Sequence, residues 1–363
     1  MGRPKKDRGK GSKDGDEQKH AKFLVGVETE APLAVTRRNQ VTGLDDLLQG
    51  TEALRELAWL FNENGLHAYD SAVDHEHDHS RWAITIDSSI EVGQELQGVG
   101  TPVEIKSPPI TVDNSRHEEK FHTMWAIIDR FKIQSIEHWK MASTHIHFSL
   151  KDLPQFPLPV AQQLAFCVVY FEEAIDDLIP AMTDSTDRKR PGGWKNCDRF
   201  SKRNRVRPEY NDRRPLDDLR SCWGAIRSTR DIKELSDLMC YDDDAYRRTH
   251  GREMPPSRSA QETLTWIDFT TEFVQAAGRV DRAKLDAAFE GIISFTEALG
   301  FGLGGNTREV QLQWEDQWAR GGNSSGITSY YLQLFMDCED GFWDRMKYIK
   351  DCIESDLARL PRN

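Results

Sequence analysis

Four short segments of the chain alternate apolar and polar residues, and this alternation predicts β-strands at about 23–30, 82–87, 102–106 and 144–150. Successive side chains of a strand point to opposite faces, so each segment has one apolar face and one polar face. We expect the apolar faces to pack against a core and the polar faces to share the other side of one sheet.

Apolar residues recur at helical spacing in six further segments, three of them in the second half of the chain. The predicted helices cover about 44–62, 116–133, 160–179, 261–277, 283–299 and 328–358. Residues 183–215 are rich in Arg, Pro, Gly and Asn, which is typical of a long irregular segment. This order of elements predicts an α+β fold, in which helices pack on one face of an antiparallel sheet.

The polar faces of the predicted strands collect many acidic residues. They carry Glu28, Glu30, Asp87, Glu104, His145 and His147, with Lys106 as the main positive residue. Like charges on neighbouring strands repel each other, and carboxylate oxygens are good ligands for Mg²⁺ and Mn²⁺. A metal site would explain this face, and so would an ordinary solvated face of an antiparallel sheet. The pattern by itself leaves both interpretations open.

The composition limits the classes of function. The 363 residues carry a net charge of −12, which argues against nucleic-acid binding by the body of the protein. We find no run of 18 apolar residues and no apolar leader after Met1, so we expect no membrane span and no secretion. The six cysteines include no C-x-x-C pair and are typical of reduced thiols. These features predict a cytoplasmic protein, and the basic Arg3-Pro4-Lys5-Lys6 patch keeps nuclear import open.

Four motifs follow one another in the order seen in the amidoligase family. They are Gly26-Val27-Glu28-Thr29-Glu30, Trp82 to Ile90, Val103 to Pro109, and Thr144-His145-Ile146-His147. Over about residues 23–280 the chain resembles this family, which is related to glutamine synthetases and glutamate–cysteine ligases. The resemblance implies an ATP-dependent carboxylate–amine ligase that forms an amide through an acyl phosphate. It also implies a curved antiparallel sheet of the glutamine-synthetase-like kind.

The resemblance further implies ATP and Mg²⁺ (or Mn²⁺) as cofactors, with small-molecule or peptide carboxylates and amines as substrates. By position, Glu28, Glu30 and Glu104 would be metal ligands. Of the two histidines, His147 would bind metal and His145 the phosphates of ATP. Asp87 would act in catalysis, either by holding a metal ion or by orienting the incoming amine.

The family has a later E-F-R strand, and the corresponding window here reads His250-Gly251-Arg252. Arg252 matches the phosphate-binding Arg and would be catalytic, whereas His250 stands where a metal-binding Glu is expected. Histidine can bind a divalent ion but prefers softer metals than a carboxylate does. Arg258 is a second candidate for the Arg and would bind ATP.

A basic segment at 188–207 carries Trp194 and Phe200 among its Arg and Lys residues. The resemblance favours a lid over the acidic strands, with Arg199 and Arg203 as ATP-binding residues. Nucleic-acid contact and an ordinary exposed basic loop are the alternatives.

On this resemblance the chain divides into a disordered tail at 1–21, an amidoligase-like catalytic domain at 22–300 and a C-terminal helical extension at 301–363. The tail contains hardly any apolar residue. The apolar stripe of 328–358 suits core packing or a dimer seam, so an oligomer stays open.

Two rival functions remain. The first is a noncatalytic nucleotide- or metal-binding relative, which the His250 substitution motivates. The second is a zinc-dependent hydrolase that would use His145, His147 and the Asp74-His75-Glu76-His77-Asp78-His79 cluster. A flexible acidic loop is the simpler interpretation of that cluster.

Overall fold

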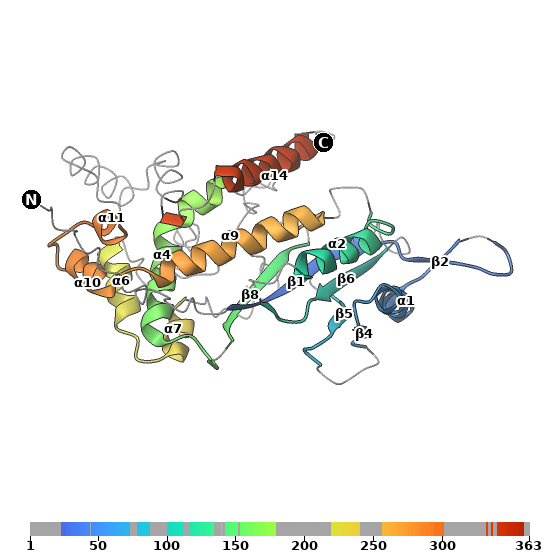
Figure 1. Ribbon diagram of the computed structural model, residues 1–363, viewed down its shortest axis with the longest axis horizontal. Helices are drawn as coiled ribbons and strands as arrows, with labels where there is room; N and C mark the ends of the chain where they lie inside the picture. The colour runs from blue at the N-terminus through green and yellow to red at the C-terminus, as the bar shows by residue number, and fades with distance from the viewer. Residues whose placement is uncertain are drawn as a thin grey trace, which may run out of the picture.

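The sheet and the helical part of the protein lie side by side and are joined by one long helix (Figure 1). The computed structural model describes residues 23–43, 45–72, 78–87, 100–111, 116–133, 139, 142–151, 153–178, 219–239, 256–300, 332, 335–336 and 340–358. The first 22 residues, the 183–215 segment and the late motif at 250–252 therefore lie outside the described residues.

The sheet is built around one long central strand. Its strands are β1 (Phe23–Leu33), β4 (Ala68–Asp70), β5 (Trp82–Ile86), β6 (Thr101–Lys106), β7 (Ile110–Thr111) and β8 (Thr144–Leu150). Strand β1 pairs along one edge with β6 and then β7, and along its other edge with β8. Strand β5 pairs with β6, and β4 lies beyond β5.

The sheet is mixed, so the prediction of an antiparallel sheet is wrong in one place. Strands β6, β7 and β8 all pair antiparallel with β1, as expected, but β4 pairs parallel with β5, with Ala68 opposite Trp82. The connection 71–81 leads from the end of β4 back to the start of β5. Parallel neighbours need a crossover of this kind, whereas a two-residue turn would have produced an antiparallel pair.

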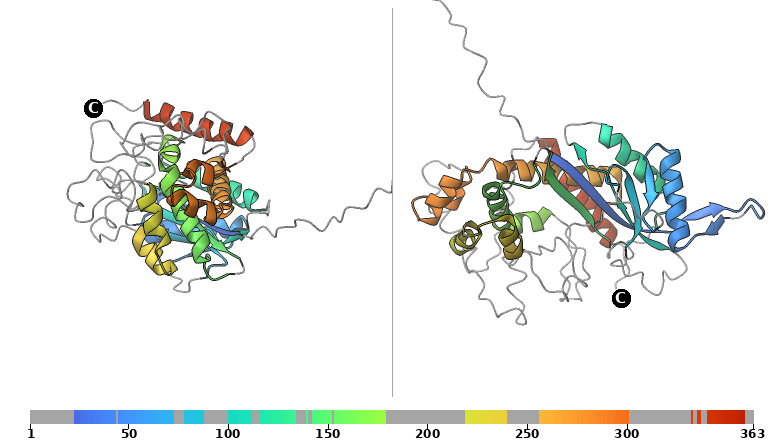
Figure 2. Two further views of the ribbon diagram at one scale, coloured as in Figure 1. Left: turned by 90° about the vertical axis from the view of Figure 1, so that its left-hand side faces the viewer. Right: turned by 90° about the horizontal axis from the view of Figure 1, so that it is seen from below.

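Helices cover the apolar face of the sheet, as the sequence predicts (Figure 2). Val25, Val27, Ile84 and Ile105 of the strands are fully buried or nearly so. They share a core with the apolar sides of α1 (Gly50–Glu63) and α2 (Arg116–Ile128). The alternation in 82–87 places Ile86 on the same face as Trp82 and Ile84, but Ile86 is 42% exposed at the end of β5.

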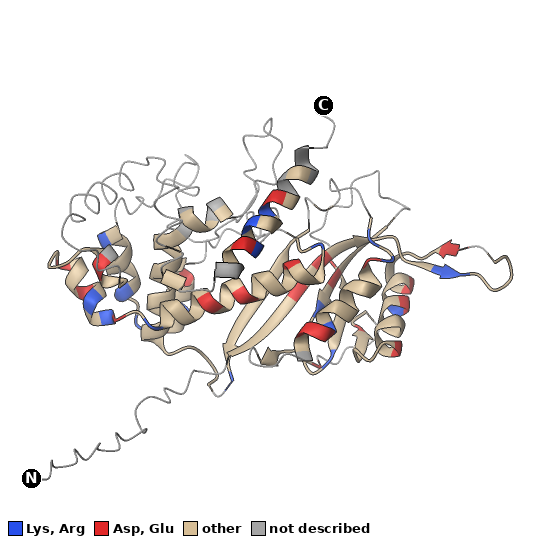
Figure 3. Cartoon of the chain, turned by 45° about the horizontal axis from the view of Figure 1, so that its top comes forward, with Lys and Arg blue, Asp and Glu red and all other residues tan. Residues whose placement is uncertain are grey.

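A two-stranded ribbon projects from the molecule where the first helix was expected to begin. The ribbon consists of β2 (Thr36–Arg38) and β3 (Asp45–Leu47), and α1 begins only at Gly50. Arg37 lies opposite Asp46 and Arg38 opposite Asp45, so charges of opposite sign face each other across the two strands (Figure 3). Such pairing with solvated side chains explains why helical spacing near residue 47 did not produce a helix.

The second half of the described chain is helical, as predicted, although the boundaries differ. It contains α4 (Leu158–Leu178), α6 (Leu219–Arg227), α7 (Ile232–Met239), α9 (Ala260–Gly278), α10 (Arg282–Phe289), α11 (Phe295–Ala298) and α14 (Asp340–Ala358). The helix predicted at 283–299 is two helices, because Gly291 turns the chain with a φ of +79° and Ser294 caps α11.

The described residues form two hydrophobic cores, one beneath the sheet and one among the helices of the second half, and helix α9 contributes to both. Its Ile267 packs in the core beneath the sheet, whereas Trp266, Phe269 and Phe273 pack among the other helices. The indole N–H of Trp125 in α2 also donates to Thr263 of α9 at 2.9 Å. Because α9 shares both cores, it fixes the helical part relative to the sheet.

Helix α14 packs on α9 and α4, and its Phe342, Met346 and Ile349 lie in the helical core. The predicted boundary at residue 300, between the catalytic domain and the C-terminal extension, stays a prediction.

Among the helices that the structure describes, none combines the length and the apolar character that crossing a bilayer requires.

We expect Phe269→Ala to lower the free energy of unfolding by about 3–5 kcal/mol, because it leaves a cavity in a packed aromatic core. The Phe269 ring is 1% exposed and stacks on Phe342 with ring centres 6.5 Å apart. Urea unfolding followed by circular dichroism measures the change. Trp59→Ala, at a side chain that is 54% exposed, is the control and should cost less than about 1 kcal/mol.

Candidate metal and substrate site on the acidic face of the sheet

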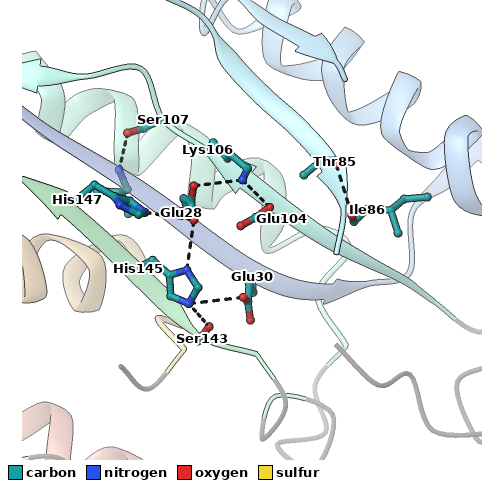
Figure 4. Close-up of polar contacts among 11 residues, drawn as sticks. Glu28, Glu30, Thr85, Ile86, Glu104, Lys106, Ser107, Ser143, His145 and His147 are labelled. Atoms are coloured by element: carbon teal, nitrogen blue, oxygen red, sulfur yellow. Dashed lines mark hydrogen bonds and ion pairs between the residues drawn. The ribbon is translucent and has the colours of Figure 1, made fainter. Parts of the chain in front are cut away.

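The face of the sheet opposite α1 and α2 gathers polar residues from three adjacent strands, and we call it the acidic face. Its members are Glu28 and Glu30 of β1, Glu104 and Lys106 of β6, and His145 and His147 of β8 (Figure 4). Cross-strand partners on one face lie close enough to interact directly. In register, Glu28 lies opposite both Lys106 and His145, and Glu30 lies opposite Glu104.

Glu28 is the most highly connected of these residues. Its Oε1 lies 3.2 Å from the Lys106 Nζ, and its Oε2 lies 3.2 Å from His145 Nδ1 and 3.3 Å from His147 Nε2. Contacts with the two histidines, with a contribution from the Lys106 charge, hold the pKa of Glu28 well below its usual range. Glu28 is therefore a carboxylate at neutral pH.

The surroundings of Glu30 disfavour its charged form, in contrast to those of Glu28, because Glu30 is only 2% exposed and lies among other acids. Burial, together with the charge of Asp87, raises the pKa of Glu30 to about 7. Its Oε1 lies 3.7 Å from His145 Nε2, and its Oε2 has no hydrogen-bond partner among the described residues. A buried carboxylate oxygen without a partner is energetically unfavourable, and a bound cation would satisfy it.

Glu104 is half-buried, and burial raises its pKa, although the adjacent Lys106 counteracts part of this effect. The Lys106 Nζ lies 2.9 Å from Glu104 Oε2. Burial tends to lower the pKa of Lys106, but the hydrogen bonds to Glu104 and Glu28 and the charges of these two carboxylates together outweigh this effect, so that the pKa is raised. Lys106 is therefore a permanent positive charge on the acidic face.

Two groupings within the described residues have ligand atoms close enough to share a metal ion. Glu30, Glu104 and His145 form one, and Glu28, His145 and His147 form the other, each with all ligand atoms within 4.8 Å of one another. The first has two carboxylates and suits Mg²⁺ or Mn²⁺. The second has two imidazoles and one carboxylate, a set that catalytic zinc sites also use.

A hollow of about 510 Å³ lies over this face. At the sheet it is lined by Glu28, Glu104, Lys106 and His147, and at its other end by Tyr69 and Arg81. Its volume falls within the range of small-ligand sites. Negative, positive and aromatic groups thus line one space that is large enough for a substrate.

The Arg81 guanidinium gives the hollow a second fixed positive charge. It lies 5.1 Å from the centre of the Tyr69 ring and donates to the backbone oxygen of Ala68 at 2.9 Å. These contacts hold the side chain at the β4–β5 end of the hollow, where an anionic group of a ligand would meet it.

Ser143, His145 and Glu28 form a chain of contacts that resembles a nucleophilic triad. The Ser143 hydroxyl lies 2.8 Å from His145 Nε2, and His145 Nδ1 lies 3.2 Å from Glu28. Ser143, however, is 0% exposed, so its oxygen cannot reach a substrate. The contacts instead fix the orientation of the His145 ring.

The structure brings together five of the sequence-predicted site residues: Glu28, Glu30, Glu104, His145 and His147. Asp87 follows β5, and its charge influences both Glu30 and Glu104. The roles assigned to these residues stay predictions.

Arg258, a predicted ATP-binding residue, lies at the start of α9, where its guanidinium contacts Glu262 at 3.1 Å. The neighbouring Ser257 bonds to Thr144 at the head of β8, through its backbone N–H at 2.8 Å. The chain that follows the late motif thus returns to the Ser143 end of the site. Arg199, Arg203, His250 and Arg252 lie outside the described residues, as does most of the 74–79 cluster.

Three residues of the site were not predicted in their present roles. Lys106 was counted as a counter-charge, and its position between two carboxylates follows from the same alternation that placed Glu104. Arg81 and Ser143 precede predicted strands by one residue, and no local pattern marked either of them.

Residues 21–290 match the model of the family described as "Putative amidoligase enzyme". The match covers well over half of the 363 residues, and the chain belongs to this family of ligase-type enzymes. The resemblance seen in the four motifs is thereby confirmed. No curated protein matches the chain.

We expect Glu30→Gln to stabilise the metal-free protein at pH 8. The folded-state pKa of about 7 lies above the ordinary glutamate pKa of 4.5, so the stability that Glu30 contributes in its protonated form is lost as the pH rises through 7. A neutral amide removes this loss, which amounts to at most about 3 kcal/mol. Thermal and urea unfolding in EDTA at pH 5 and pH 8 measure the effect, which should shrink at pH 5.

Glu63→Gln, at an exposed position of α1, is the matched control and should change stability by less than about 0.5 kcal/mol. If Glu30→Gln were instead destabilising at pH 8, Glu30 would be a satisfied structural carboxylate, and the case for a cation beside it would be lost.

Proposed function

We propose that the protein is an ATP-dependent carboxylate–amine ligase that forms an amide through an acyl phosphate. The observation that carries this proposal is the buried Glu30 carboxylate, whose Oε2 has no partner among the described residues and which lies beside Glu104 and His145. Family membership supports the ligase class. A curved sheet of the glutamine-synthetase-like kind and a cytoplasmic location belong to the same proposal.

Glu30, Glu104 and His145 would hold Mg²⁺ or Mn²⁺ at the edge of the hollow. When bound, such an ion neutralises phosphate charge and polarises the phosphoryl group. The donor set fits, because it combines two carboxylates with a partnerless oxygen in a buried position.

In the proposed reaction, a substrate carboxylate oxygen attacks the γ-phosphorus of ATP, and ADP leaves. The amine nitrogen then attacks the acyl carbon, inorganic phosphate leaves, and the nitrogen loses a proton. The positive Lys106 would contact the phosphoryl oxygens from the sheet, and Arg81 would contact an anionic group at the far end of the hollow. Asp87 would orient the amine and accept its proton. These residues act by positioning and by stabilising charge.

The decisive test is phosphate release from ATP and Mg²⁺ across a panel of amino acids and amines. We expect one combination to depend on both substrates, and Glu28→Gln and Glu30→Gln each to lower its rate on the order of 10²-fold or more, as the loss of a charge-stabilising group does. Glu63→Gln should behave like the wild type.

Equal rates for all four proteins would refute the ligase assignment. Nucleotide binding without amine-dependent phosphate release would instead favour the noncatalytic relative.

A zinc-dependent hydrolase is the second candidate, because Glu28, His145 and His147 form a two-histidine, one-carboxylate grouping. It predicts zinc that copurifies at one equivalent, is lost in His147→Gln, and supports hydrolysis without ATP. Metal analysis of protein purified without added metal checks this. We expect substoichiometric zinc, since Glu28 is already paired with Lys106.

A further inference from the structure

Lys106 occupies the centre of the acidic face. Its ammonium lies 3.2 Å from Glu28 Oε1 and 2.9 Å from Glu104 Oε2, so it joins the two metal-ligand groupings that these carboxylates belong to. The side chain is 42% exposed and lines the hollow. An ammonium has three N–H donors, and two of them are directed at these carboxylates.

The position between Glu28 and Glu104 has the properties of a cation site. One carboxylate oxygen lies on either side, and His147 lies 3.3 Å from the Glu28 Oε2. A divalent ion placed there would be repelled by the ammonium at close range. Lys106 and an ion therefore compete for the same carboxylate oxygens.

The grouping of Glu30, Glu104 and His145 is not blocked in this way. Glu30 is buried, and its Oε2 has no partner among the residues that the structure describes. Its ligand atom lies within 4.8 Å of those of Glu104 and His145. Lys106 contacts Glu104 through Oε2 and has no recorded contact with Glu30 among the described residues, so this end of the acidic face retains oxygen ligands for an ion.

We propose that the Lys106 ammonium is a built-in cation that fills the position between Glu28 and Glu104, so that the protein binds one divalent ion rather than two. That ion lies between Glu30, Glu104 and His145. The third N–H of Lys106 is directed at an anionic oxygen of the bound substrate, a phosphate or a carboxylate. This last point rests on the proposed function, whereas the number of ions does not.

A tethered ammonium differs from a second metal ion in two useful ways. It carries one positive charge rather than two, and it does not leave when product leaves. The acidic face therefore keeps part of its charge balance throughout turnover, and only one ion has to be supplied from solution.

The test is a Mn²⁺ titration of the full chain, followed by electron paramagnetic resonance and equilibrium dialysis. The wild type should bind one Mn²⁺, and K106M, which removes the charge at similar length, should bind two and show a spin-coupled spectrum. K106R retains the positive charge and should bind one. Lys120→Met, at an exposed position of α2, is the matched control and should also bind one.

Two Mn²⁺ in the wild type, or one in K106M, would overturn the proposal for Lys106. In either case amine-dependent phosphate release would still support the ligase, so the two failures are distinguishable. No bound Mn²⁺ in the wild type would also overturn the proposal for Lys106, whereas the ligase assignment is decided by amine-dependent phosphate release. Circular dichroism of K106M verifies that it is folded, and K106Q, which also removes the charge, takes its place if K106M does not fold.

Discussion

The pairing of β1 with β6 on one edge and β8 on the other is the constraint on which the candidate site depends. This register sets Glu28 between Lys106 and His145, and it sets Glu30 opposite Glu104. Because side chains alternate between faces, a slip of one residue would turn every acid of β1 into the core and every valine out of it. The buried Val25 and Val27 therefore hold the acids in place, and the packing of one face positions the chemistry of the other.

The carboxylates of the acidic face differ in how well the surrounding residues stabilise their negative charge. Glu28 is stabilised as a carboxylate by two histidines and a lysine, whereas Glu30 is buried with one partnerless oxygen among the described residues. Stable folds do not normally leave a buried acid in this state, and departures of this kind are concentrated at functional sites. The buried carboxylates of Glu30 and Glu104, which are unfavourable without a cation, are also the ones that a divalent ion would bind.

The fold was predictable where the pattern was strong and local. The period-two segments became β1, β5, β6 and β8, and the long apolar stripes became α4, α9 and α14. It was not predictable where tertiary pairing overrode local spacing. Residues 45–47 form half of a charged ribbon instead of a helical turn, and β4 lies parallel to β5 because its connection crosses back. Neither outcome has a signature in the residues concerned.

The sequence alone determined which side chains share a face, because alternation along a strand is a local property, and its four motifs determined the family. Only the tertiary structure decided which strands are neighbours, and hence that Lys106 lies between Glu28 and Glu104 and that Arg81 lines the same hollow. Distances between strands and the burial of Glu30 depend on contacts between residues far apart in the chain. The periodicity of apolar residues along the chain contains no information about such contacts, so only the tertiary structure shows them.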